Sequence, residues 1–417
     1  MSGIRLFWTR VHTSLWFLPT VLTAAAIGLA LLTLAIDRSG ALSGADTRVL
    51  FGAGAEGARG VLSTIAGSII TVTGVVFSIT IVVLQLASSQ YSPRVLQSFT
   101  EDRANQVVLG VFIGTFTYSL LVLRTVRSTF EDSERFVPAL SVTVALLLGL
   151  ISIGCLIFFV NHIARSIEAE SIIERAAGNA RRVVDHLFPE TGGSPAEVAR
   201  PDIDARLDTA SLPVRVETAG YLQDVDVAGV LRLADRHGLL VRMERRIGEF
   251  LLPADVLFSV MPRTVGEKVL GEVRGCATLG PARTRHHDLE RSLVELTDIG
   301  IRALSPGMND PTTAMASIDR VTEVLALLAT RSFPALQRTG ADGELRFIGR
   351  RREFADFVEG AYAPLIHHAR RDPHVSARIR ESLQTLLLRV PASRRDPFAA
   401  QLALLERGRD GMRTGGA

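Results

Sequence analysis

The chain contains 417 residues, of which 47% are hydrophobic, 21% charged and 6% aromatic, and its mean hydropathy is +0.27. The formal net charge of +3 disfavours a nucleic-acid-binding protein, which needs a strongly basic surface. The only two cysteines, Cys155 and Cys276, lie far apart in the sequence, which excludes a disulfide framework and a cysteine-rich zinc site.

Long uncharged stretches dominate the first 164 residues. A helix needs about 20 apolar residues to cross the hydrocarbon core of a bilayer. The stretches are Thr13–Ile36, Gly60–Pro93, Ala104–Leu123 and, apart from His162, Phe136–Ala164. We therefore predict a transmembrane domain over 1–164, with spans at about 15–36, 61–87, 105–123 and 137–160, in contact with the lipid bilayer.

The second span is the longest and the most polar. Thr64, Thr71, Ser78 and Gln85 recur every seven residues, which places them along one face of a helix. Small residues fall on or beside the same face: Gly67, Ser68, Gly74, Ser88 and Ser89. Such a stripe is poorly suited to lipid, because polar groups without partners in hydrocarbon cost several kcal/mol.

Two interpretations of the stripe stay open. The first is close helix packing, because Gly, Ser and Thr let helix backbones approach each other. The second is a hydrated pathway, which Gln85 favours because its side chain is too large for a close-packed seam. The pathway hypothesis assigns the lining to six residues: Thr64, Ser68, Thr71, Ser78, Gln85 and Ser89.

The segment Ser88–Arg94 ends this span. Pro93 disfavours helix at the residue before it. Tyr91 and Arg94 stand where an interfacial belt is expected, and Arg94 could also line a pore mouth and attract anions.

Two segments carry a resemblance to a known family. Phe77–Phe99 reads FSITIVVLQLASSQYSPRVLQSF, and Ala303–Ala314 reads ALSPGMNDPTTA. Both resemble signature segments of the bacterial membrane-protein family called domain of unknown function 2254, and the resemblance extends from Trp8 to about Leu405. The family implies four membrane spans followed by a cytosolic domain, and it implies no activity, substrate or catalytic residue. Its usual Pro-Gly-Asp-Phe turn is replaced here by Ile247–Phe250, so the rigidity of the Pro is lost.

Topology follows from span number and charge. An even number of spans places both termini on one side, and Arg181 and Arg182 give that side a slight excess of arginine. We expect a multi-pass protein of the bacterial inner membrane with both termini in the cytoplasm.

The remainder of the chain has dense and mixed charge, as in a solvated domain. The expected fold class is a membrane protein, mainly α, with four transmembrane helices followed by a cytosolic, mostly helical domain that contains a small α+β module. We predict an amphipathic helix and linker over 165–200, the α+β module over 201–265, a helical domain over 266–408 and a disordered tail over 409–417.

Several helix boundaries are marked by capping residues. Asp226 is expected to begin a helix that Gly238 ends. Pro306 and Gly307 stop a helix, after which Asn309 or Asp310 caps the next one.

No catalytic constellation stands out. His286, His287, Asp288 and Glu290 lack a third partner at metal-ligand spacing, so we expect no metal site, no catalytic residue, no cofactor and no enzymatic activity. We expect an oligomeric channel or permeation protein with the second span lining the pathway, forming a homo-oligomer, passing a small ion and binding no nucleic acid. The alternative is a membrane-anchored scaffold or sensor.

Overall fold

The computed structural model describes residues 16–39, 54–90, 102–127, 136–166, 168–188, 190, 201–283 and 288–414, with the backbone alone for 87–90, 201, 202, 204 and 408–414. The chain divides into two compact units, Ile4–Glu168 and Ala169–Ala417.

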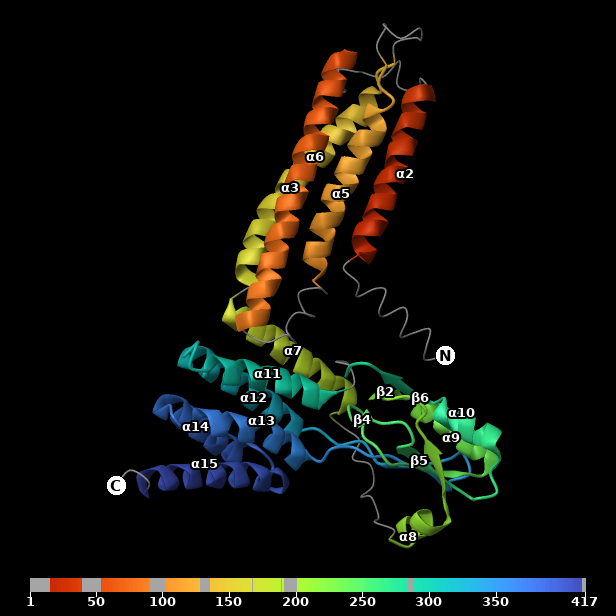
Figure 1. The fold of residues 1–417 in the computed structure, drawn as a ribbon, viewed down its shortest axis with the longest axis vertical. Helices are drawn as coiled ribbons and strands as arrows, with labels where there is room; N and C mark the ends of the chain where they lie inside the picture. The colour runs from red at the N-terminus through yellow and green to blue at the C-terminus, as the bar shows by residue number, and fades with distance from the viewer. Residues whose placement is uncertain are drawn as a thin grey trace. The chain divides into compact units, whose positions relative to one another are not determined.

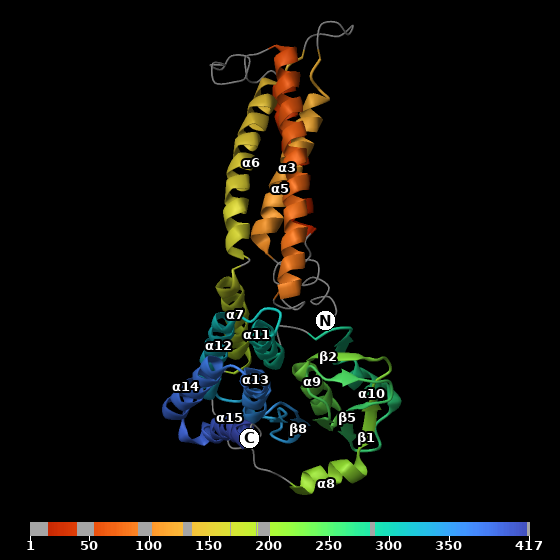
Figure 2. The ribbon, with the colours of Figure 1, turned by 60° about the vertical axis from the view of Figure 1, so that its left-hand side comes forward.

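Four long helices make up the described part of the first unit. They are α2 (Phe17–Ser39), α3 (Ala55–Gln90), α5 (Arg103–Leu123) and α6 (Ala139–Ser166). Each is long and apolar enough to cross a membrane. They run alongside one another as a bundle (Figures 1 and 2).

Helix α5 is the most buried of the four helices and packs against α2, α3 and α6. Its Tyr118 is fully buried, and the phenol oxygen lies 2.9 Å from Thr33 Oγ1 and donates to the Ser141 carbonyl at 3.1 Å. A buried tyrosine hydroxyl needs such partners. The bond network therefore ties α2, α5 and α6 together inside an otherwise apolar core.

A second polar tie joins α2 to α6. The Asp37 carboxylate accepts the backbone N–H groups of Leu140 and Ser141 at 3.1 and 3.0 Å, and the Ser141 hydroxyl at 2.6 Å. Asp37 thus caps the first turn of a helix to which it does not belong.

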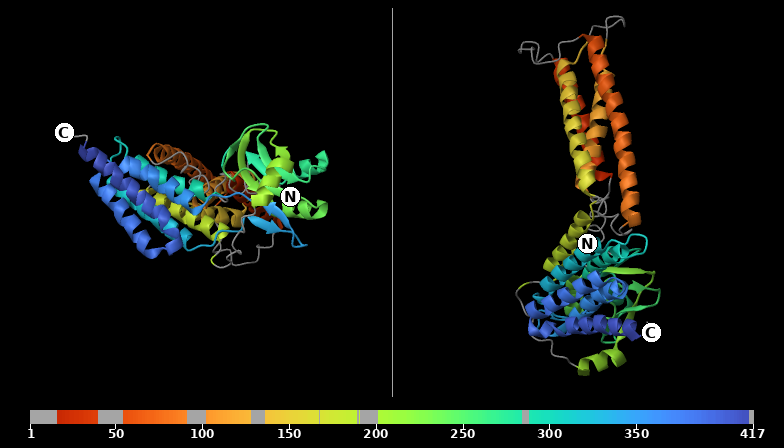
Figure 3. Two further views of the ribbon diagram at one scale, coloured as in Figure 1. Left: turned by 90° about the horizontal axis from the view of Figure 1, so that it is seen from below. Right: turned by 90° about the vertical axis from the view of Figure 1, so that its left-hand side faces the viewer.

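The second unit combines helices with two small sheets (Figure 3). Its helices of eight residues or more are α7 (Ala169–Leu187), α8 (Pro201–Ala210), α9 (Val227–His237), α10 (Glu267–Arg274), α11 (Leu289–Ala303), α12 (Pro311–Ala329), α13 (Phe354–Ala369), α14 (Pro373–Arg389) and α15 (Asp396–Thr414). Helices α11 and α12 pack against each other and against α7, while α13, α14 and α15 complete the helical part.

The strands form a five-stranded sheet in the order β1-β5-β3-β8-β7 and a three-stranded sheet in the order β4-β2-β6. They are β1 (Leu212–Arg215), β2 (Gly220–Val225), β3 (Leu240–Met243), β4 (Phe250–Leu251), β5 (Val256–Met261), β6 (Ala277–Gly280), β7 (Gln337–Thr339) and β8 (Leu345–Ile348). Pairing is antiparallel except between β3 and β8, where Val241 lies opposite Phe347.

The two sheets include strands beyond the α+β module predicted over 201–265. Strand β6 joins β2, and β7 and β8 extend the larger sheet from more than 70 residues further along the chain. These strands have only three or four residues each, too few for an alternating pattern to stand out in the sequence.

Capping residues are largely where the sequence places them. Asp226 caps α9 by accepting from the Gly229 N–H, and Gly238 ends that helix in the left-handed conformation. Asp310, and not Asn309, caps α12. At the C-terminal end, α15 extends to Thr414, into the segment 409–417 for which disorder is predicted.

Candidate functional site

The polar stripe of α3 lies on the outward face of the bundle. Its predicted lining residues Thr64, Ser68, Thr71, Ser78 and Gln85 are all exposed within the chain, as are Gly60, Gly67 and Gly74. We call the set Gly60, Thr64, Gly67, Thr71, Gly74, Ser78 and Gln85 the outward face of α3. Ser89, as a side chain, and Tyr91 and Arg94 lie outside the described residues.

The opposite face of α3 holds the helix in the bundle. Leu62, Ile69, Val76 and Val83 are buried there, with Val76 only 1% exposed, and α3 packs through this side against α5 and α6. The buried residues mark one face of the helix, and the exposed remainder carries the small and polar stripe beside large apolar residues such as Val75, Phe77 and Val82. The outward face makes no seam with the other three described spans.

The glycines of α5 and those of α3 have different surroundings. On α5, a β-carbon at Gly110 would lie 2.5 Å from Leu22 Cδ1, and one at Gly114 would lie 3.3 Å from Ala26 Cβ. The small-xxx-small pattern on α5 thus allows close packing with α2, as expected of such a pattern. A β-carbon on Gly60, Gly67 or Gly74 would meet no described atom within 4 Å.

The threonine hydroxyl groups on the outward face of α3 already have hydrogen-bond acceptors within the helix. Thr64 and Thr71 each donate to a carbonyl one turn earlier in α3, those of Gly60 and Gly67, at 2.8 Å. The amide of Gln85 has more donors and acceptors than the helix backbone can satisfy in this way. The demand for an external polar partner is therefore greatest toward the Gln85 end of the face.

His162 lies within α6, and not after the fourth span as the predicted boundary at 160 places it. Its Nε2 atom is 2.7 Å from the carboxylate of Asp102, the residue that caps α5. The pair links the beginning of α5 to the end of α6, which is a sufficient structural role for this histidine.

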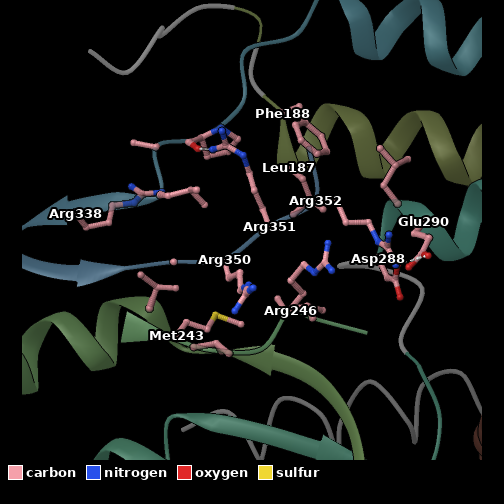
Figure 4. A pocket seen from close by; sticks show the side chains of 18 of the residues that line it. Leu187, Phe188, Met243, Arg246, Asp288, Glu290, Arg338, Arg350, Arg351 and Arg352 are labelled. Atoms are coloured by element: carbon pink, nitrogen blue, oxygen red, sulfur yellow. Dashed lines mark hydrogen bonds and ion pairs between the residues drawn. The ribbon is translucent and has the colours of Figure 1, made fainter. Parts of the chain in front are cut away.

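A second site, which sequence reasoning missed, is a cavity of about 260 Å³ in the second unit. Five arginines line it: Arg246, Arg338, Arg350, Arg351 and Arg352 (Figure 4). The parallel pairing of β3 with β8 explains their meeting, because the segments that follow parallel strands leave the sheet at one edge. Arg246 follows β3, and Arg350–Arg352 follow β8. The triplet of arginines at 350–352 is the only signal of this site in the sequence.

Two carboxylates also line the cavity, and both are already paired. Asp288 caps α11 and receives two hydrogen bonds from Arg283, at 2.6 and 2.8 Å. Glu290 pairs with Arg283 and, at 2.5 Å, with Arg352. Burial opposes the charge of Arg283, but the hydrogen bonds and charges of Asp288 and Glu290 outweigh it and raise the pKa of the guanidinium.

Comparison with known proteins identifies the chain. Residues 12–385 match the model of the family described as predicted membrane protein (DUF2254). The chain belongs to this family. It is 32% identical over 402 residues to an uncharacterised protein of Mycobacterium bovis and 31% identical to one of Mycobacterium tuberculosis strain CDC 1551, in both cases over 94% of this chain and 76% of the relative. No solved structure gave a significant match.

Membership of this predicted membrane-protein family agrees with the four membrane-length helices and assigns no activity. His286 and His287 lie outside the described residues. Among the residues that are described, no group of three His, Cys, Asp or Glu side chains is placed to hold a metal ion.

Proposed function

We propose that this family member is a homo-oligomeric permeation protein of the bacterial inner membrane, in which the α3 helices of several copies face a common axis and line a pathway for a small ion. One observation carries the proposal: the outward face of α3 is small and polar, yet the described spans of its own chain leave it uncovered. A second copy of the chain is the occupant that we propose for this face.

Helix energetics support a protein partner over lipid. A glycine in a helix interior costs about 1 kcal/mol relative to alanine. Gly60, Gly67 and Gly74 make no close contact within the described chain that would offset this cost. Close approach of another helix would offset it, since packing between helix backbones drives association in membranes.

The spacing of the residues on the outward face of α3 supports packing against the α3 helix of an identical copy. Gly60, Thr64, Gly67, Thr71, Gly74 and Ser78 alternate steps of four and three residues. That alternation is the heptad pattern of helices that cross at a small left-handed angle. The glycine-rich half suits direct contact between copies, and the half containing Ser78 and Gln85 suits contact with water.

Cysteine accessibility tests the pathway. In a chain whose Cys155 and Cys276 are replaced by Ser, a cysteine at Ser78 or Gln85 should react with a small aqueous thiol reagent. A cysteine at Val76 or Val83 is the matched control, because both positions are buried in the bundle and a thiol in an apolar site stays protonated. Equal and negligible reaction at all four positions, with no current through reconstituted protein, would replace the pathway by a scaffold or sensor role.

Assembly and topology are tested separately. Cysteines at Thr71 should form disulfide-linked dimers under mild oxidation, and the particle should be larger than one 45.1-kDa chain in mild detergent and in nanodiscs. A monomer under both conditions would contradict the proposal. For topology, a C-terminal reporter active only in the cytoplasm should give signal, whereas one active only in the periplasm should not.

A further inference from the structure

We propose that the arginine-lined cavity of the second unit binds a small organic phosphate that carries a flat ring, of the chemical class of a nucleoside monophosphate. The proposal concerns the second unit alone and does not depend on whether α3 lines a pathway.

The positive charge of the cavity wall favours binding of an anion. Five arginines stand against two carboxylates, and those carboxylates are held by Arg283 and Arg352. Arg246 is also engaged, 3.0 Å from Glu249 and 3.5 Å from Asp356. Arg351 lies 4.0 Å from Glu353 and donates to the Pro334 carbonyl. These internal pairs hold part of the wall in place, and the cationic excess lies with Arg338 and Arg350.

Arg338 and Arg350 are the two guanidinium groups most available to a ligand. Arg338 is exposed and forms no ion pair with a described residue. Arg350 donates to the Glu244 carbonyl at 2.8 Å and lies 3.9 Å from the carboxylate oxygen of that residue. That carboxylate is already used at its other oxygen by Arg242 and Ser259, at 2.7 and 2.6 Å. Neither Arg338 nor Arg350 has, among the described residues, the bidentate carboxylate partner that a guanidinium fork can accommodate.

Geometry favours phosphate over carboxylate. Arg338 comes from β7, Arg246 from the turn after β3, and Arg350 from the loop after β8, so the lining guanidinium groups belong to three different elements. Figure 4 shows Arg246 and Arg350 near each other and Arg338 apart from them, along its strand. A planar carboxylate is matched by one guanidinium fork, whereas a phosphate group offers three oxygens in three directions.

The rest of the wall is apolar and aromatic. Phe188, Met243, Ile247, Phe347 and Phe357 line the same cavity as the arginines. Aromatic faces and guanidinium planes both stack on flat rings. The volume of about 260 Å³ lies just under the range of about 300–1,000 Å³ for drug-sized ligands, which favours a ligand no larger than a nucleoside monophosphate.

Calorimetric titration of the purified full-length protein tests the assignment. The probes are AMP, GMP, CMP and UMP, with inorganic phosphate and adenosine as partial ligands. At least one monophosphate should bind about tenfold more tightly than inorganic phosphate, and AMP should bind more tightly than adenosine. The first difference reports the ring and the second the phosphate group.

Variants locate the binding. Arg338→Gln and Arg350→Gln should each weaken the best monophosphate about tenfold, which corresponds to about 1.4 kcal/mol. Arg389→Gln is the matched control, since it removes the same charge from an exposed position on α14 outside the cavity. Unchanged circular dichroism and unfolding midpoint in Arg338→Gln separate lost binding from lost folding.

Three outcomes would overturn the proposal. The first is no binding of any monophosphate. The second is binding that Arg389→Gln weakens as much as Arg338→Gln does, which indicates diffuse electrostatic attraction. The third is binding of short-chain phosphatidic acid in the absence of any monophosphate binding, which would assign the cavity to a lipid headgroup.

Discussion

Gly110 on α5 lies so close to Leu22 on α2 that a β-carbon on the glycine would stand 2.5 Å from the leucine Cδ1 atom. That atom ends a flexible side chain, but the β-carbon would also lie 3.1 Å from Leu22 Cβ and from the backbone Cα atom of Pro19, so a larger residue would push the two helices apart. Gly74 on α3 is also a helix glycine of the first unit, but a β-carbon placed there would meet no described atom within 4 Å. The two glycines therefore serve different contacts.

Exchanging each glycine for leucine separates the two roles. Gly110→Leu should destabilise the chain by about 1–3 kcal/mol, because it overfills a packed interface. Gly74→Leu should leave the stability of the single chain unchanged or slightly higher, since leucine is the better helix former. It should nevertheless weaken association between copies. The measurements are the unfolding midpoint in detergent and the particle mass, and a Gly74→Leu protein that associates like the unchanged chain would contradict the role proposed for this face.

The sequence predicts the helical architecture well, but its only signal of the arginine-lined cavity is the triplet at 350–352. Local signals are sufficient for the spans and for caps such as Asp226 and Asp310, because each depends on residues within a few positions. The cavity depends on Arg246 and Arg350, which are about 100 residues apart in sequence. They meet only because β3 pairs with β8, a long-range pairing between two four-residue strands.

The polar stripe on α3 shows a second limit of prediction from the sequence. Its period places the polar residues on one face, but periodicity does not say which face of a helix its neighbours cover. The buried positions Val76 and Val83 resolve that question, because they show α5 and α6 covering the opposite side. Among the described residues, none of the other three spans covers the outward face of α3.

Removal of the Asp37 carboxylate should loosen the bundle. Asp37→Ala leaves the N–H groups of Leu140 and Ser141 without their acceptor, and an unsatisfied buried donor costs about 1–3 kcal/mol. Asp37→Asn keeps one acceptor oxygen and should lose less. The unfolding midpoint should therefore be lowest for Asp37→Ala and intermediate for Asp37→Asn, and an Asp37→Ala protein as stable as the original would show that water replaces the carboxylate.

A ring of four charges between α7 and α12 should make stability depend on acidic pH. Arg181 contacts Glu323 at 2.6 Å and Glu174 at 2.5 Å, and Arg320 contacts the same two glutamates at 2.7 Å each. Burial opposes the charge of Glu323, but Arg320 and Arg181 outweigh it and lower its pKa below the ordinary 4.5. A lowered pKa in the folded state stabilises the fold above pH 4.5, and this contribution is lost as the pH falls through the lowered value.

The variant Glu323→Gln should therefore lose stability at pH 7 and lose less additional stability than the original chain between pH 5 and 3. The effect should lie within about 0.2–1 kcal/mol, because the pair is partly exposed and screened. Glu359→Gln is the control, since Glu359 is exposed on α13. Parallel pH curves for the original chain and Glu323→Gln would show that the ring contributes nothing to the acid dependence.

Two glycines with positive φ should respond differently to a methyl group. Gly238 (φ +63°) ends α9 in open space, whereas Gly248 (φ +92°) would place a β-carbon 2.7 Å from Asp288 Oδ2 and 2.9 Å from Arg283 Nη2. Gly238→Ala should cost about 1–2 kcal/mol, the penalty for a side chain in left-handed backbone. Gly248→Ala adds a collision with an ion pair whose Asp288 carboxylate is buried, so it should cost at least about 1 kcal/mol more. The unfolding midpoints of the two alanine variants measure the difference. Equal losses would mean that Arg283 and Asp288 move aside freely, and that the wall of the arginine-lined cavity is less firmly held than its ion pairs indicate.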